Sequence, residues 1–127
     1  MKLHVVDQKK RKVYKLKGYG VIGRGKELEL IETLQKTKPI SIIMDSNHME
    51  FLFYKTGVLR IPTCSSENLN HAALAVGYNL EDGNNRHLIV KNSFGSQWGE
   101  GGYFRIALFE GNMCGIATRA TFPIPLI

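Results

Sequence analysis

Apolar and charged residues alternate with a helical period most clearly over residues 26–37, KELELIETLQKT. Leu28, Ile31 and Leu34 recur three positions apart, with charged side chains between them. This spacing places apolar side chains on one face of a helix and charges on the other. Pro39 follows, and the residue before a proline avoids helical backbone geometry. The pattern therefore predicts one helix over residues 26–37.

Most other apolar residues occur in short runs that are typical of strands. The runs are ISIIM (40–44), GVLRI (57–61), HAALAVGY (71–78), HLIVKNS (87–93), GGYFRIALF (101–109) and GIATRATFPI (115–124). The run at 71–78 alternates, with His71, Ala73 and Ala75 on one face, whereas MEFLFY (49–54) fits a helical turn or a strand. One helix followed by several short strands predicts a mainly β, α+β fold, an antiparallel, β-barrel-like sheet with helical decoration.

The length of 127 residues predicts a single folded domain. We expect this domain to span residues 13–127, after a charged arm or linker at residues 1–12. Four consecutive basic residues at 9–12 contribute to a net charge of +6. A nucleic-acid-binding arm and a solvated linker both fit this run. No aromatic residues interleave with it, so we favour the linker and expect no nucleic-acid partner.

Membrane and targeting segments are not evident in the sequence. No apolar run approaches the roughly 20 residues of a membrane-spanning helix, so no membrane partner is expected. The apolar part of the N-terminus covers only residues 3–6, which is too short for the core of a signal peptide. We therefore predict no signal peptide in this chain.

Cys64 and Cys114 are the two cysteines of the chain. An even count permits one disulfide, and two buried free thiols are the alternative. Neither cysteine belongs to a CxxC or CxxH motif, the spacing that is typical of zinc sites. The sequence therefore predicts no metal and no cofactor.

Taken alone, His71 and Asn92 each have two interpretations. A histidine on a strand of small residues is either a hydrogen-bonded structural residue or a group that transfers protons. Asn92, which precedes Gly95 in a glycine-rich loop, is either a turn residue or a side chain that orients the histidine. The two residues alone do not decide between these interpretations.

Five ordered motifs cover most of the chain: PISIIMDSNHMEFLFYKTGV (39–58), TCSSENLNH (63–71), NHAALAVGY (70–78), LIVKNSFGSQWGEGGYFRIA (88–107) and NMCGIATRATFPI (112–124). Together these motifs resemble the second half of the papain-like cysteine peptidases, the cathepsin family. The resemblance runs from about residue 13 to residue 125. It implies the β-rich C-terminal domain of the papain fold.

By this resemblance, His71 matches the catalytic histidine and Asn92 the asparagine that orients it. An imidazole takes the proton of a cysteine thiol, stabilises the thiolate and later protonates the leaving amine. An asparagine amide holds the ring without adding a negative charge. Trp98 matches a tryptophan on the primed side of the substrate cleft. Cys64 and Cys114 match a disulfide, which by closing about 50 residues would contribute roughly 4 kcal/mol to stability.

Three further positions match the S2 pocket, which selects the P2 side chain of a substrate. Ile43 and Ala72 keep two walls of this pocket apolar, whereas Arg119 matches its base. Arg119 would favour an acidic P2 side chain or fill the pocket, and an exposed strand arginine is the alternative. Phe94 stands where the family usually has tryptophan, so the histidine–asparagine hydrogen bond should be shielded less completely from water.

The resemblance implies a cysteine endopeptidase domain that acts on peptide or protein substrates. In the family, the nucleophilic cysteine and the oxyanion-hole glutamine lie in the other half, so this chain alone is expected to be inactive. We expect it to pair with that half in cis or in trans, or to dimerise, through an exposed interdomain face. The alternative is a non-catalytic pseudo-peptidase that binds partners through the same face. The resemblance implies a lysosomal or extracellular location.

Overall fold

The chain forms mainly β structure with two short α-helices. The computed structural model describes residues 4–7 and 12–126. In chain order the elements are β1 (His4–Asp7), β2 (Lys12–Val21), α1 (Glu27–Lys36), β3 (Ile40–Met44), α2 (Met49–Leu52), β4 (Val58–Leu59), β5 (His71–Asn79), the 3-10 turn η1 (Gly83–Asn85), β6 (His87–Lys91), β7 (Tyr103–Ala107), the 3-10 turn η2 (Met113–Gly115) and β8 (Thr121–Pro125). The predicted mainly β, α+β class is confirmed. The segment at 49–54, which fitted a helical turn or a strand, forms α2.

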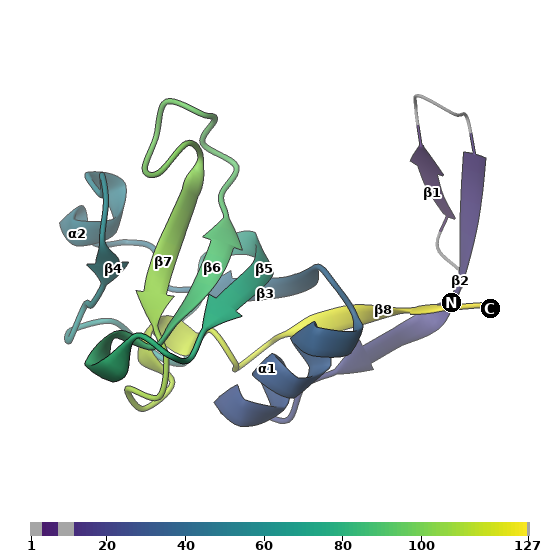
Figure 1. The fold of residues 1–127 in the computed structure, drawn as a ribbon, viewed down its shortest axis with the longest axis horizontal. Helices are drawn as coiled ribbons and strands as arrows, with labels where there is room; N and C mark the ends of the chain where they lie inside the picture. The colour runs from purple at the N-terminus through teal and green to yellow at the C-terminus, as the bar shows by residue number, and fades with distance from the viewer. Residues whose placement is uncertain (1–3, 8–11, 127) are drawn as a thin grey trace.

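The strands form one sheet in the order β1-β2-β8-β3-β5-β6-β7-β4. Neighbouring strands pair antiparallel, except that β4 and β7 run parallel. The sheet is open and does not close into the barrel-like form expected from the sequence, because β1 and β4 are its edges and do not pair with each other in the described residues. Figure 1 shows β2 and β8 extending away from strands β3 to β7, with β1 beside β2 and with α2 and β4 at the opposite end.

One face of the central strands forms the core, and the other face is exposed. In β3 the buried side chains are Ile40, Ile42 and Met44, with partly exposed residues between them. The predicted alternation of β5 holds through its first half, where Ala73 and Ala75 are buried. The intervening positions 72 and 74 face solvent, so the exposed face of the sheet is itself apolar.

Helix α1 occupies the predicted segment but buries a different set of side chains. Leu30, Ile31 and Leu34 are buried, whereas Leu28 is 58% exposed, contrary to the predicted apolar face. The first residue of the buried face is Glu27, which is only 7% exposed. A carboxylate at this position is tolerated because it binds a distant loop.

The Glu27 carboxylate holds the loop that leads from β7 toward β8. Its two oxygens accept the backbone N–H groups of Phe109 at 2.8 Å and of Asn112 at 3.0 Å. Both donors have positive φ, 60° and 55°. The carboxylate therefore accepts hydrogen bonds from two backbone N–H groups of a loop that lies outside helices and strands.

Asn112 completes this turn with its side chain. Its amide oxygen accepts the Ala117 N–H at 2.9 Å, and its amide nitrogen donates to the Thr118 hydroxyl at 2.8 Å. Residues 113–115 form η2, and the following residues form a turn. The last strand was predicted at 115–124 but begins only at Thr121. The hydrogen bond from the Ala117 N–H to the Asn112 side chain holds the preceding residues in the turn, so they do not join the strand.

Replacing Glu27 by alanine should lower the free energy of unfolding by about 2–4 kcal/mol, because two partly buried backbone donors lose a charged acceptor. Glu32→Ala is the matched control, since Glu32 is an exposed glutamate of the same helix and should change stability by less than about 0.5 kcal/mol. Urea unfolding followed by the fluorescence of Trp98 measures both changes. Equal losses for the two variants would contradict the role of Glu27.

Candidate functional site

The side chains of His71 and Asn92 meet at one end of the β5–β6 pair. His71 is the first residue of β5, and Asn92 directly follows β6. The antiparallel register pairs Leu74 with Lys91, which brings the two strand ends together. His71 Nε2 lies 2.7 Å from Asn92 Oδ1. Asn92 is buried and His71 is half-buried, so the ring keeps an edge toward solvent.

Hydrogen bonding assigns the proton on the His71 ring. Asn92 Oδ1 also accepts the Ser93 backbone N–H at 2.8 Å, which orients the amide oxygen toward both donors. An oxygen acceptor requires that Nε2 carry the hydrogen, so Nδ1 of the neutral ring keeps a lone pair. Asn92 Nδ2 is buried and has no hydrogen-bond partner among the described residues. The arrangement presents His71 Nδ1 as a proton acceptor.

Aromatic rings enclose the pair on the side of α2. Phe51 is fully buried, and its ring centroid lies 5.6 Å from that of His71. Phe94 lies 5.2 Å from His71, and Trp98 lies 5.3 Å from Phe94. Trp98 is held in place by a hydrogen bond of 3.2 Å from its Nε1 to the Leu52 carbonyl. Phe94 is 44% exposed, so solvent reaches one side of this cover.

The loop between β6 and β7 carries two of these rings and is fixed by an ion pair. Arg105 donates to both carboxylate oxygens of Glu100, at 2.9 and 2.8 Å. These hydrogen bonds outweigh burial and lower the pKa of Glu100 to about 2. Gly99 has a φ of 60°, and a Cβ there would lie 2.6 Å from the Tyr103 carbonyl oxygen. Only glycine therefore allows the loop to pass this point.

Asp45, at the end of β3, joins the segments around the pair. Its Oδ1 accepts the Asn70 amide at 2.9 Å and the Asn47 N–H at 3.2 Å. Its Oδ2 accepts His48 Nε2 at 2.7 Å and the Ser65 N–H at 2.9 Å. Asn70 directly precedes His71 in the chain. The carboxylate therefore fixes the backbone that enters β5.

The charge of Asp45 is stabilised by these bonds. Burial alone would raise its pKa, because a carboxylate loses hydration in the interior. The hydrogen bond from the Ser65 N–H, followed by those from His48, Asn70 and Asn47, reverses this effect and lowers the pKa to about 2. The carboxylate is therefore ionised near neutral pH and depends on its partners for stability.

The residues predicted to form the S2 pocket lie on neighbouring strands. Ile43 of β3 is directly opposite Ala72 of β5, on the partly exposed face of the sheet. Arg119 is exposed and precedes Thr121, which pairs with Ser41 of β3. Across the residues that the structure describes, no hydrogen bond or ion pair involves the Arg119 side chain. Two of the three positions are thus adjacent, and the third lies two residues before the next strand, β8.

The exposed sheet face is hollowed beside Asn92. A depression of about 350 Å³ is lined by Ser41, Ala72, Leu74, Lys91, Asn92 and Ser93. An adjoining depression of about 390 Å³ shares Ser41 and Leu74 and continues to Tyr19 and Phe122. The face is therefore concave and largely apolar from the histidine–asparagine pair to β2 and β8.

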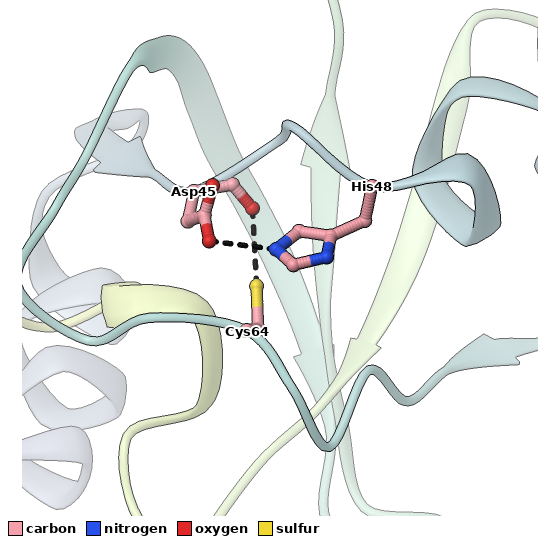
Figure 2. Close-up of side chains that lie close together, drawn as sticks. All are labelled: Asp45, His48 and Cys64. Carbon is pink, nitrogen blue, oxygen red and sulfur yellow. Dashed lines mark hydrogen bonds and ion pairs between the residues drawn. The ribbon is translucent and has the colours of Figure 1, made fainter.

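One group of side chains in the described part of the chain combines metal-ligating atoms. Asp45, His48 and Cys64 each offer such an atom, and these atoms lie within 4.8 Å of one another (Figure 2). Cys64 Sγ lies 3.1 Å from the Asp45 carbonyl oxygen, but it is bonded to Cys114. A disulfide sulfur has no proton to donate and is no thiolate ligand. The predicted disulfide is confirmed, and it blocks this group as a metal site.

Three residues of the site, Asp45, Phe51 and Glu100, were not predicted from the sequence. Asp45 ends a buried apolar run and is followed by SNH, and an acid directly after a buried strand was a usable signal. Phe51 belongs to a run that fitted two kinds of element, so the direction of its side chain was undetermined. Glu100 lies among glycines, and its partner becomes adjacent only when β7 forms.

Comparisons with known proteins agree with this architecture. Residues 2–124 match the family described as papain family cysteine protease. Human Cathepsin L2 is 45% identical over 109 residues, covering 84% of this chain and 33% of that protein. The chain spans about a third of the length of the curated relatives it matches.

Solved structures show the same fold. Digestive procathepsin L 3 from the larval midgut of Tenebrio molitor superposes with a TM-score of 0.83 at 38% identity, covering 91% of this chain and 37% of that chain. The bromelain protease of Ananas comosus, in complex with the E64 inhibitor, gives a TM-score of 0.77 at 36% identity, covering 87% of this chain and 51% of that one. Among the described residues, no helix has the length and the apolar composition that crossing a membrane requires.

Replacing Asp45 by asparagine should remove part of the acid sensitivity of the fold. The folded pKa of about 2 lies below the ordinary 3.8, so this carboxylate stabilises the fold above about pH 4. That stabilisation, about 2 kcal/mol, is lost as the pH falls toward 2. Asp45→Asn should therefore be less stable at pH 7 and show a flatter stability profile between pH 4 and 2. Glu50→Gln, an exposed control in α2, should retain the wild-type profile in urea titrations, and an unchanged profile for Asp45→Asn would refute the assignment.

Proposed function

The chain belongs to the papain family of cysteine proteases, and we propose that it supplies the histidine and asparagine of a Cys-His-Asn peptidase site. The observation that carries this proposal is the 2.7 Å contact between His71 Nε2 and Asn92 Oδ1. This contact directs the ring proton to Nε2 and leaves Nδ1 as a base. A positioned imidazole base is what proton transfer from a thiol requires.

The proposed reaction is acyl transfer, in which His71 moves a proton twice. Nδ1 takes the proton of a cysteine thiol, and the thiolate attacks the carbonyl carbon of a peptide bond. The imidazolium then gives the proton to the amine nitrogen as the C–N bond breaks. In the second step His71 takes a proton from water, the resulting hydroxide hydrolyses the thioester, and the proton returns to sulfur. Asn92 holds the ring throughout without adding a negative charge.

The thiol of this site has to come from another segment. The chain has two cysteines, and both form the disulfide. We propose that these 127 residues alone are inactive, and that a second peptidase half, in cis or in trans, contributes the nucleophile and the oxyanion donors. Peptides and proteins would then be the substrates.

The exposed sheet face is the surface proposed for docking this second half. Leu74 is 38% exposed and Tyr19 54%, and both line the depressions that begin at Asn92. Contiguous exposed apolar surface of this kind marks an interface. A homodimer through the same face is the competing occupant. A non-catalytic binding module would also use this face but would not depend on His71.

The compartment proposed for the protein is the lysosome or the extracellular space. The Cys64–Cys114 disulfide supports this proposal, because such bonds persist in oxidising environments.

We further propose that Arg119 gives the S2 pocket a preference for an acidic P2 side chain. Ile43 and Ala72 supply apolar walls, and the exposed guanidinium just before the neighbouring strand β8 supplies a positive charge. A guanidinium pairs with a carboxylate through two parallel hydrogen bonds. A leucine side chain at P2 would leave this charge without a partner.

The isolated chain should not hydrolyse a fluorogenic peptide or react with a thiol-directed epoxide inhibitor. Addition of the thiol-bearing half of a papain-family relative, fused or mixed, should produce hydrolysis. His71→Ala should then lower kcat/KM by at least about 1,000-fold. Asn92→Ala should lower it by a smaller factor, because the base itself remains. Hydrolysis by the isolated chain that His71→Ala abolishes would sink the requirement for a second half.

Two variants separate docking from chemistry in that experiment. Leu74→Glu places a charge on the proposed docking face and should prevent association in sedimentation velocity. His71→Ala should associate like the wild type and lack only activity. Normal association of Leu74→Glu would refute the docking face, and equal activity of His71→Ala and wild type would refute the peptidase role.

In the completed enzyme, a substrate with glutamate at P2 should be cleaved with a kcat/KM about tenfold above that of its leucine counterpart, or roughly 1.4 kcal/mol of discrimination. Arg119→Ala should reverse this preference. Arg24→Ala is the control, since Arg24 is an exposed arginine that pairs with Glu67, and it should leave the ratio unchanged. Equal rates for the two substrates in the wild type would refute the role of Arg119.

A further inference from the structure

We propose that reduction of the Cys64–Cys114 disulfide creates a zinc-type metal site from the two cysteines, His48 and Asp45. This site is independent of the peptidase proposal, because it uses neither His71 nor Asn92. In the oxidised chain the sulfurs are bonded to each other and the site does not exist. The proposed site is therefore one that thiol reduction opens.

The ligand atoms already lie near the positions that a metal ion needs. The atoms offered by Asp45, His48 and Cys64 lie within 4.8 Å of one another. Figure 2 shows the Asp45 carboxylate facing the His48 ring, and the Cys64 sulfur facing the main-chain carbonyl of Asp45 from a second segment. In a tetrahedral zinc site the ligand atoms are roughly 3–4 Å apart. The sulfur of Cys114 is bonded to that of Cys64 but does not belong to this close group. In the proposed site it turns toward the other three atoms after reduction and supplies the fourth ligand.

Backbone contacts hold these segments in place without using the ligand atoms. The Asp45 N–H donates to the Cys114 carbonyl at 2.9 Å, and the Cys64 N–H donates to the Ile61 carbonyl at 3.0 Å. Asn70 binds Oδ1 of Asp45, and it would remain as an outer partner that orients the carboxylate while Oδ2 binds metal. Partners of this kind tune metal affinity strongly.

The site is accessible from solvent. The His48 side chain is 18% exposed. A depression of about 440 Å³ reaches Cys64 and is also lined by Arg60, Ser66 and Met113. A small reductant and then a metal ion therefore have an entrance, although Cys114 itself is buried.

The chemistry balances with a dithiol as the reductant. The dithiol breaks the Cys64–Cys114 bond, two electrons and two protons pass to the two sulfurs, and the reductant becomes a disulfide. A divalent metal ion then displaces both thiol protons to solvent. The His48 ring shifts its remaining proton to Nδ1, which frees Nε2 from Asp45 as a ligand. Two thiolates and an imidazole favour zinc or cobalt over magnesium or calcium.

Cobalt(II) titration of the full chain tests the proposal, because tetrahedral thiolate–cobalt sites absorb in the visible and near ultraviolet. After reduction, the chain should bind one cobalt ion with both bands, and the oxidised chain should show neither. His48→Ala should weaken cobalt affinity by at least about tenfold. His71→Ala is the matched histidine control and should bind like the wild type. A double Cys64→Ser, Cys114→Ser variant should show no thiolate band in the presence of reductant.

Circular dichroism and the fluorescence of Trp98 monitor folding during the titration. Cobalt or zinc should keep the reduced chain folded or restore the fold, and a chelator should reverse the effect. Equal cobalt affinity for His48→Ala and wild type would overturn the proposal. So would a reduced chain that binds no cobalt, stays unfolded with the metal, or binds it equally well in urea.

Discussion

The buried carboxylate of Asp45 is the constraint on which the rest of the site depends. A buried charge is costly unless hydrogen bonds replace its hydration, and four donors from residues 47 to 70 converge on this group. Each of these bonds also fixes a segment of backbone. The end of β3, the start of α2, the segment after Cys64 and the residue before β5 therefore hold their relative positions together. Loss of any one segment would leave the charge poorly paired and weaken the others.

The geometry of His71 follows from that frame and from a second set of contacts. The start of β5 sets its backbone, Asn92 sets the ring proton, and Phe51 supports the ring from the core. Phe94 and Trp98 cover the outer side but leave part of it open. The orientation of one imidazole thus rests on a strand register, an amide and an aromatic cluster. No one of these three alone would hold the ring with its proton on Nε2.

The disulfide and the exposed sheet face are two places where side chains of this chain could make further interactions. The alternation of β3 and β5 puts apolar side chains on both faces of the sheet, and only one face is covered by this chain's own core. The disulfide includes the Cys64 sulfur, which lies close to Asp45 and His48. The fold holds in position both the apolar side chains of the exposed face and the side chains around Cys64. A partner protein at the first place, or a metal ion at the second after reduction, would therefore meet a preorganised site.

The sequence by itself determined the features that depend on neighbours in the chain or on intact motifs. The span of α1, the alternation at the start of β5, the fold class, the family and the disulfide pairing were all predicted, and the candidate pair His71 and Asn92 was named from its motifs. Only the tertiary structure decided that Glu27 replaces Leu28 on the buried face of α1, and that the last strand starts at Thr121. The same holds for the donors around Asp45 and for the proximity of Asp45 and His48 to Cys64. The physical reason is that these hydrogen bonds and contacts join residues up to 85 positions apart, and local periodicity carries no information about such partners.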